Sequence, residues 1–284
     1  MSYSFLAISD IHLGWKLFNL PELAEDLKDN LTRVVDLALK LKVDYIFVVG
    51  DLYDSNKPSP DLVKFVSGQV KRAGANGCLV AGIAGDHDKP INESAWIHLS
   101  SMLPINDVSP DSKFVGYDYS DNSQENVDKL ANHPDKKNIE WIFLHGQAPE
   151  LFQWCEDKKK LDFKSVDLIN DFPNLKGIIL GDIHVPIEGV ISDPAQIVSD
   201  RFIGYCGSLG MVKTDEIDTK TGLLYYDGDK LARVPFKPNR EFIKADVVTL
   251  LEPINLVPSM TKFFRDAKGK KPIFVIEFNK DTKH

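Results

Sequence analysis

Aspartates and histidines gather at five places where an apolar run of the sequence stops. The five clusters are Ser9-Asp10-Ile11-His12, Gly50-Asp51, Gly85-Asp86-His87-Asp88, His145-Gly146 and Gly181-Asp182-Ile183-His184. They hold four of the chain's seven histidines. Any one cluster is more simply a turn, a helix cap or a histidine at the edge of the core. Together they predict a metal-dependent site, because carboxylates and imidazoles are the usual protein ligands of divalent ions.

The apolar runs before these clusters have the features of strands buried on both faces of a sheet. They cover residues 3–8, 45–49, 78–83, 141–144 and 178–180, and they are short, β-branched and poorly alternating. Leucine and valine at helical spacing predict a helix over residues 21–41, and residues 60–73 and 91–103 are weaker helix candidates. Alternating strands and helices predict parallel strands, whose carboxyl ends meet at one edge of the sheet. The five clusters should therefore converge.

The second part of the chain has a different pattern. From about residue 185, short runs at residues 201–206, 223–226 and 231–236 predict an antiparallel meander, with a hairpin turn at residues 227–230. Pro238 precedes a final pattern of strand, helix and strand. We therefore expect one large domain over residues 1–239 and a short cap-like segment over residues 240–284.

Composition excludes some kinds of protein. The chain has 284 residues, 43% hydrophobic and 27% charged, as in an ordinary globular protein. Its net charge of −8 argues against binding nucleic acid through overall charge, so local basic patches or metal ions would have to make the contacts. Cys78, Cys155 and Cys206 are widely spaced and are interpreted as reduced structural residues. A secretory signal and a long apolar run are lacking, which predicts a cytoplasmic protein.

The order of the motifs resembles a known superfamily. SDIHLG, GDLYDSNKPSP, GDHD, HG and GDIH, over residues 9–184, are similar to the motifs of the calcineurin-like metallophosphoesterases. GDLYDSNKPSP resembles the DNA double-strand-break-repair nucleases, among them the SbcD exonuclease subunit and its phage relatives, and Tyr205-Cys206-Gly207-Ser208 resembles their YPGS element. A Ser/Thr phosphatase would have Asp-Arg-Gly where this chain has Ser55 and Asn56. The resemblance covers about residues 3–245 and implies an α/β fold, with a β-sandwich core flanked by helices and a small C-terminal α+β cap-like segment.

The resemblance also implies a two-metal site. It assigns Asp10, His12, Asp51 and His184 to a first ion, and Asp51, Asp86, His145 and Asp182 to a second. Two ions roughly 4 Å apart clamp a phosphodiester and generate the attacking hydroxide. His87 would stabilise or protonate the leaving oxygen, with Asp88 orienting its imidazole.

Two residues depart from the superfamily pattern. Asp86 stands where the family has Asn, and Asp182 stands where it has the first His of GHxH. Carboxylates in place of these neutral ligands make the site more anionic, which favours Mn²⁺, or else Mg²⁺, over zinc. Both departures fall on the second ion, and loss of that ion is the alternative.

The resemblance implies a two-metal-dependent DNA nuclease, either exonuclease or endonuclease, that hydrolyses phosphodiester bonds in DNA repair, recombination or phage DNA processing. Two alternatives stay open: a phosphodiesterase or phosphatase for small or nucleotide substrates, and a non-catalytic scaffold that binds DNA ends. A phage-encoded chain would act in the host cytoplasm.

The resemblance also implies partners besides DNA. These are an SbcC-like ABC-type ATPase subunit and a second copy of the chain, joined through residues 60–73 and 91–103. About 45 residues follow Asn239, few for the family's cap and ATPase-binding segment, so the ATPase partnership stays open. Lysine runs at residues 136–137 and 158–160 are interpreted as solvated surface, and a third at residues 268–271 fits either solvated surface or phosphate contacts.

Overall fold

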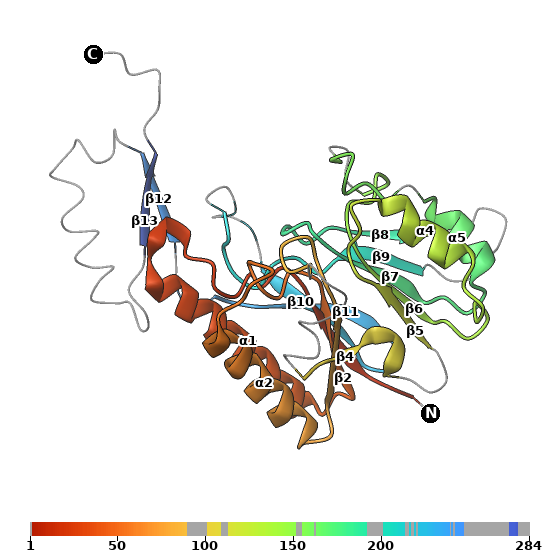
Figure 1. The fold of residues 1–284 in the computed structure, drawn as a ribbon, viewed down its shortest axis with the longest axis horizontal. Helices are drawn as coiled ribbons and strands as arrows, with labels where there is room; N and C mark the ends of the chain where they lie inside the picture. The colour runs from red at the N-terminus through yellow and green to blue at the C-terminus, as the bar shows by residue number, and fades with distance from the viewer. Residues whose placement is uncertain are drawn as a thin grey trace, which may run out of the picture.

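The computed structural model describes most of the chain. The described residues are 2–89, 101–108, 113–151, 155–161, 163–191, 201–213, 216, 219, 221–238, 240, 242–246 and 273–277. Figure 1 shows two main sheets with helices on the outer side of each. No helix among these residues is long and apolar enough to cross a membrane.

The first sheet has the strand order β11-β10-β1-β2-β3-β4. Its parallel strands are β1 (Phe5–Ile8), β2 (Tyr45–Val49), β3 (Leu79–Ile83) and β4 (Leu103–Pro104). Helix α1 (Pro21–Leu41) connects β1 to β2, and α2 (Pro60–Gly74) connects β2 to β3. The predicted parallel strands and the helices at residues 21–41 and 60–73 are therefore confirmed.

The second sheet has the strand order β5-β6-β7-β9-β8. Strands β5 (Phe114–Tyr117), β6 (Trp141–His145), β7 (Gly177–Gly181) and β9 (Arg201–Tyr205) are parallel, and the edge strand β8 (Glu188–Ile191) is antiparallel. Helices α4 (Ser123–Ala131) and α5 (Ser165–Asp171) accompany this sheet. Its strands β6 and β7 are those predicted at residues 141–144 and 178–180.

The core lies in three layers of apolar contact. One cluster packs the two sheets against each other and is rich in aromatic rings, with Phe47 and Phe143 from opposite sheets 4.6 Å apart between ring centroids. A second packs the first sheet against α1 and α2, and a third packs the second sheet against α4 and α5. The result is the predicted β-sandwich flanked by helices.

The predicted antiparallel meander is confirmed for its last two strands and is wrong for the first. β9 runs parallel to β7 in the second sheet, whereas β10 (Gly222–Tyr226) and β11 (Leu231–Pro235) pair antiparallel at the edge of the first. Strand pattern alone does not reveal which sheet a strand joins. The hairpin turn is confirmed, since the Asp227 amide donates to the Lys230 carbonyl at 3.1 Å.

Two predicted segments lie wholly or partly outside the described residues. Residues 91–100 of the helix expected at 91–103 are not described, and its last residue, Leu103, instead opens strand β4. The lysine run at residues 268–271 is likewise not described. Strands β12 (Phe242–Asp246) and β13 (Ile273–Glu277) form a separate parallel pair. The boundary at Asn239 stays a prediction.

Candidate metal centre

The five clusters converge where the two sheets meet. Each follows or ends one of the strands β1, β2, β3, β6 and β7 at its carboxyl end. Ligand atoms lie within 4.8 Å of one another in each of these groups: Asp10, His12 and His184; Asp10, Asp51 and His145; Asp51, Asp86 and His87; and Asp86, His145 and Asp182. The structure thus brings together all seven predicted metal ligands and His87.

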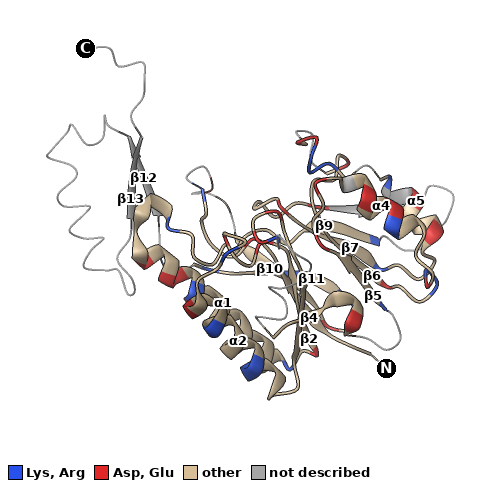
Figure 2. Ribbon diagram, viewed as in Figure 1, with Lys and Arg blue, Asp and Glu red and all other residues tan. Residues whose placement is uncertain are grey.

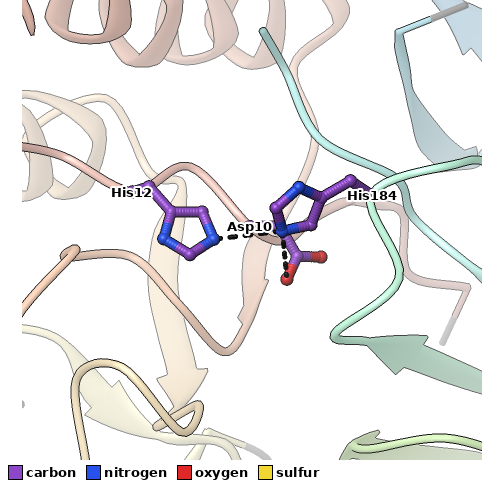
Figure 3. Close-up of side chains that lie close together, drawn as sticks. All are labelled: Asp10, His12 and His184. Carbon is purple, nitrogen blue, oxygen red and sulfur yellow. Dashed lines mark hydrogen bonds and ion pairs between the residues drawn. The ribbon is translucent and has the colours of Figure 1, made fainter. Parts of the chain in front are cut away.

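The first-ion cluster, Asp10, His12, Asp51 and His184, is buried. The His12 and His184 rings point toward each other beside the Asp10 carboxylate (Figure 3), with their Nε2 atoms 3.2 Å apart. His12 Nε2 lies 3.5 Å from Asp51 Oδ2, and His184 Nε2 lies 4.0 Å from Asp10 Oδ1. Four electron-pair donors aimed at one small volume repel one another unless a cation lies between them. This donor set fits a divalent metal ion.

Several of these residues have unusual backbone conformations. Asp10, His12 and Asp51 have φ of 50 to 52°, and Asp182 has φ of 94°. Such values are uncommon for residues other than glycine and cost of order 1–3 kcal/mol each. The loop after β1 is held against the loop after β2, because the amides of Ile11 and His12 both donate to the Asp51 carbonyl, at 2.9 and 3.0 Å. The strained turns are concentrated at the metal centre, as expected of a functional site.

Two glycines allow the close approach of the ligands. A Cβ at Gly50 would lie 2.0 Å from His145 Nδ1, and a Cβ at Gly85 would lie 2.0 Å from Asp51 Oδ1. Any side chain at either position would displace a predicted ligand. The Gly-Asp pairs of the sequence therefore serve packing as well as turn geometry.

Two of the histidine ligands have a polar partner at Nδ1, the ring nitrogen that faces away from the centre. His184 Nδ1 lies 2.5 Å from Glu216 Oε1, and Glu216 accepts hydrogen bonds from the amides of Val212 and Lys213. Burial lowers the pKa of His184, but the hydrogen bond to Glu216 and the negative charges of Asp10 and Glu216 together outweigh burial and raise that pKa. His145 Nδ1 faces the Val49 carbonyl at 3.0 Å, which leaves Nε2 for the centre. Such partners fix the ring and tautomer of metal-ligating histidines. Glu216 is not among the site residues predicted from the sequence, because no local motif marks it.

His87 is held by Asp54 rather than by Asp88. Its Nδ1 lies 3.5 Å from Asp54 Oδ1 and 3.3 Å from the Asp54 carbonyl. The hydrogen bond to Asp54 raises the pKa of His87 to about 9, against the opposing effect of burial. Asp54 Oδ1 also lies 3.3 Å from His12 Nδ1, so one carboxylate contacts both rings. At 44% exposure, the His87 side chain remains open to a substrate.

The predicted role of Asp88 is therefore wrong. Its carboxylate is buried and accepts hydrogen bonds from the amides of Leu52, Tyr53 and Gly85 at 2.8, 3.1 and 2.7 Å. It ties the loop after β2 to the loop after β3. Adjacent residues in a turn point in different directions, so sequence neighbourhood to His87 was a poor guide.

A lysine contacts the second-ion cluster, which consists of Asp51, Asp86, His145 and Asp182. His145 Nε2 lies 3.3 Å from Asp86 Oδ1 and 3.6 Å from Asp51 Oδ2. Lys159 Nζ lies 2.7 Å from Asp86 Oδ2 and 2.6 Å from Asp182 Oδ1. Burial raises the pKa of Asp86, but hydrogen bonds with His145 and Lys159 outweigh it and lower that pKa. The interpretation of residues 158–160 as solvated surface is wrong for Lys159, whose side chain is only 19% exposed.

Comparison with known proteins agrees with this geometry. Residues 3–186 match the family model described as calcineurin-like phosphoesterase. A dimetal phosphatase from Danio rerio shares the fold, with a TM-score of 0.52 at 12% identity over 82% of this chain and 96% of that one. The protein TT1561 of Thermus thermophilus does so as well, with a TM-score of 0.50 at 13% identity over 84% of this chain and 100% of that one. Fold and site thus define a phosphoesterase of the calcineurin-like class.

Similarity to curated proteins identifies the family within this class. The DNA double-strand break repair protein Mre11 of Sulfurisphaera tokodaii is 41% identical over 95% of this chain and 72% of its own length. Mre11 of Methanocaldococcus jannaschii is 25% identical over 75% of this chain and 58% of its own length. Mre11 of Archaeoglobus fulgidus is 28% identical, and the match spans only 46% of that protein. The chain belongs to the Mre11 family of calcineurin-like phosphoesterases.

Proposed function

We propose that this protein is a metal-dependent DNA nuclease that hydrolyses phosphodiester bonds during DNA double-strand break repair. The observation that carries the proposal is the convergence of the first-ion cluster with an exposed His87 beside it, whose pKa the hydrogen bond to Asp54 raises. The names of the curated relatives supply the substrate and the process.

Each side chain has a proposed task. Asp10, His12, Asp51 and His184 would hold a divalent ion, Mn²⁺ in preference to Zn²⁺ because the surroundings are rich in carboxylates, with Mg²⁺ as the alternative. When bound, the ion neutralises phosphate charge and activates water. Hydrolysis adds the water oxygen to phosphorus and breaks the bond from phosphorus to the leaving oxygen. His87, held as an imidazolium by Asp54, donates the proton that the leaving oxygen requires.

Contacts to DNA would be local. Figure 2 shows basic and acidic residues interspersed along α1 and α2, with no continuous basic band on them. With a net charge of −8, the chain gains little from overall attraction to phosphate. We therefore expect binding to depend on the metal centre and the lysines around it.

The wider setting follows from the same proposal. The SbcC-like ATPase partner and the homodimer remain proposals that rest on the family resemblance. Helix α2 supplies one of the two segments expected at a dimer contact, and residues 91–100 are outside the described chain. An enzyme that acts on DNA works in the compartment that holds it, and for a prokaryotic or phage-encoded chain that compartment is the cytoplasm.

A nuclease assay tests the proposal. Linear duplex and single-stranded DNA would be incubated with Mn²⁺, with Mg²⁺ and with EDTA. We expect Mn²⁺-dependent cutting that Asp51→Ala abolishes, because Asp51 lies in two of the predicted ligand groups. His87→Ala should slow cutting by about 10²–10⁴-fold, the usual contribution of a general acid.

His133→Ala is the matched control, since His133 lies in the loop after α4 and belongs to none of the ligand groups. It should leave cutting unchanged. If the folded protein cleaves bis(p-nitrophenyl) phosphate but not DNA, the proposal gives way to a small-substrate phosphodiesterase. If it cleaves neither, a DNA-end-binding scaffold replaces it.

A further inference from the structure

Lys159 is fixed in place by the backbone of its own segment. The Gln147 amide donates to the Lys159 carbonyl at 2.7 Å, and the Leu161 amide donates to the Gln147 carbonyl at 2.8 Å. These bonds dock residues 159–161 on the chain that follows β6. The Lys159 amide also donates to the Glu156 carbonyl at 2.9 Å. These hydrogen bonds fix the backbone of Lys159, and its side chain points toward the metal centre.

The Lys159 ammonium lies where the second ion would bind. Its Nζ is 2.7 Å from Asp86 Oδ2 and 2.6 Å from Asp182 Oδ1, two oxygens of the predicted second-ion ligands. An Mg²⁺ or Mn²⁺ ion bound to the same two oxygens at about 2.1 Å would need the volume that the ammonium fills. Two like charges in that space would also repel each other strongly.

The two departures from the superfamily pattern fall on the residues that Lys159 contacts. An ammonium has three donors and no acceptor, so it needs oxygen acceptors, and carboxylates are the strongest of these. Asp86 and Asp182 supply them where the superfamily has an amide and an imidazole. A further bond from Gln147 Nε2 at 2.7 Å holds the other oxygen of Asp182.

The first-ion cluster differs from the second-ion cluster in its ion pairs. Among the described residues, no lysine or arginine makes an ion pair with Asp10 or Asp51. Its donors face one another directly, as the 3.2 Å separation of the His12 and His184 Nε2 atoms shows. The ammonium therefore affects one half of the centre only.

We propose that the Lys159 ammonium takes the place of the second divalent ion, so that the chain binds one divalent ion, in the first-ion cluster. This inference rests on the proposed function only in requiring a metal ion at that cluster. Lys159 then acts as a fixed positive charge beside the ion. Two of its three N–H groups bind Asp86 and Asp182, and the third can donate to a phosphate oxygen of the substrate.

Counting bound ions tests this proposal. The whole chain would be dialysed to equilibrium against Mn²⁺, and the bound metal would be measured by elemental mass spectrometry. An electron paramagnetic resonance spectrum of the same sample would be recorded. We expect one Mn²⁺ per chain with the spectrum of an isolated ion. Lys159→Met keeps the length of the side chain but removes its charge, and it should bind two Mn²⁺ with a spin-coupled spectrum.

Lys158→Ala is the matched control on the same segment, because Lys158 is exposed, and it should bind one Mn²⁺. Two ions bound by the unmodified protein with similar affinity would overturn the proposal, whether or not any variant folds. A folded Lys159→Met variant that still binds one ion would overturn it too. The readout is independent of DNA cleavage, so a negative nuclease assay leaves this result intact.

Discussion

At the scale of single residues, Asp54 contacts both a predicted metal ligand and the proposed acid. Its Oδ1 lies 3.3 Å from His12 Nδ1 and 3.5 Å from His87 Nδ1. The His12 contact orients a ring whose other nitrogen faces the first-ion cluster. The His87 contact keeps that imidazole protonated at neutral pH. One carboxylate thus positions a ligand and sets the charge of the proton donor.

Asp54→Asn should lower the pKa of His87 from about 9 toward the ordinary value near 6.5, because the charged partner of its hydrogen bond is lost. The raised pKa stabilises the fold fully below about pH 6.5, and this contribution disappears as the pH rises through about 9. The measurement is an NMR titration of His87 in the metal-free protein.

Asp121→Asn serves as the control for this titration, because Asp121 pairs with Lys89 at the surface and does not touch His87. A His87 pKa that stays near 9 in Asp54→Asn would show that another group holds the proton.

At the scale of elements, loops after neighbouring strands must be held together for the ligands to meet. Asp51 follows β2 and Asp86 follows β3. The buried Asp88 carboxylate accepts amide hydrogen bonds from both loops. It acts as a brace between the two loops without contacting the substrate side of the centre.

Asp88→Ala would leave buried amides of Leu52, Tyr53 and Gly85 without their acceptor. We expect the free energy of unfolding to fall by about 2–4 kcal/mol, since each unsatisfied buried group costs about 1–3 kcal/mol and the loops can relax in part. Urea denaturation in EDTA measures the change. Asp121→Ala, which removes an exposed ion pair, should cost less than about 1 kcal/mol. Equal losses for the two variants would refute the bracing role.

At the scale of the whole molecule, the centre depends on two sheets keeping their relative position. Asp10, Asp51 and Asp86 come from the first sheet, and His145 and Asp182 come from the second. The aromatic cluster between the sheets, with Phe5, Phe47 and Phe143, sets their separation. Packing between the two sheets therefore controls the distances between ligands.

Phe143→Ala should lower the free energy of unfolding by about 3–5 kcal/mol, because it opens a cavity in a fully buried contact between sheets. It should also weaken Mn²⁺ binding at a temperature where the variant is still folded. Thermal denaturation and equilibrium dialysis measure the two effects. Phe18→Ala, at a side chain 46% exposed, should change stability by less than about 0.5 kcal/mol. Unchanged Mn²⁺ affinity in folded Phe143→Ala would disprove the coupling.

Local sequence determined the parallel strands of the first sheet, the helices at residues 21–41 and 60–73, and the set of aspartates and histidines at strand ends. Each of these features depends on a short segment of sequence, either on its hydrophobic periodicity or on polar residues that directly follow a strand. Gly50 and Gly85 were also evident from the sequence, because each directly precedes a predicted ligand in the motifs.

Only the tertiary structure decided which sheet β9 joins and which groups support the centre. Asp54, Glu216 and Lys159 contact His87, His184 and Asp182 across 33, 32 and 23 residues of chain. No periodicity links such pairs, because their meeting depends on how loops from different strands pack together. The motifs therefore predicted a site with two ions, and the fold placed a lysine in half of it.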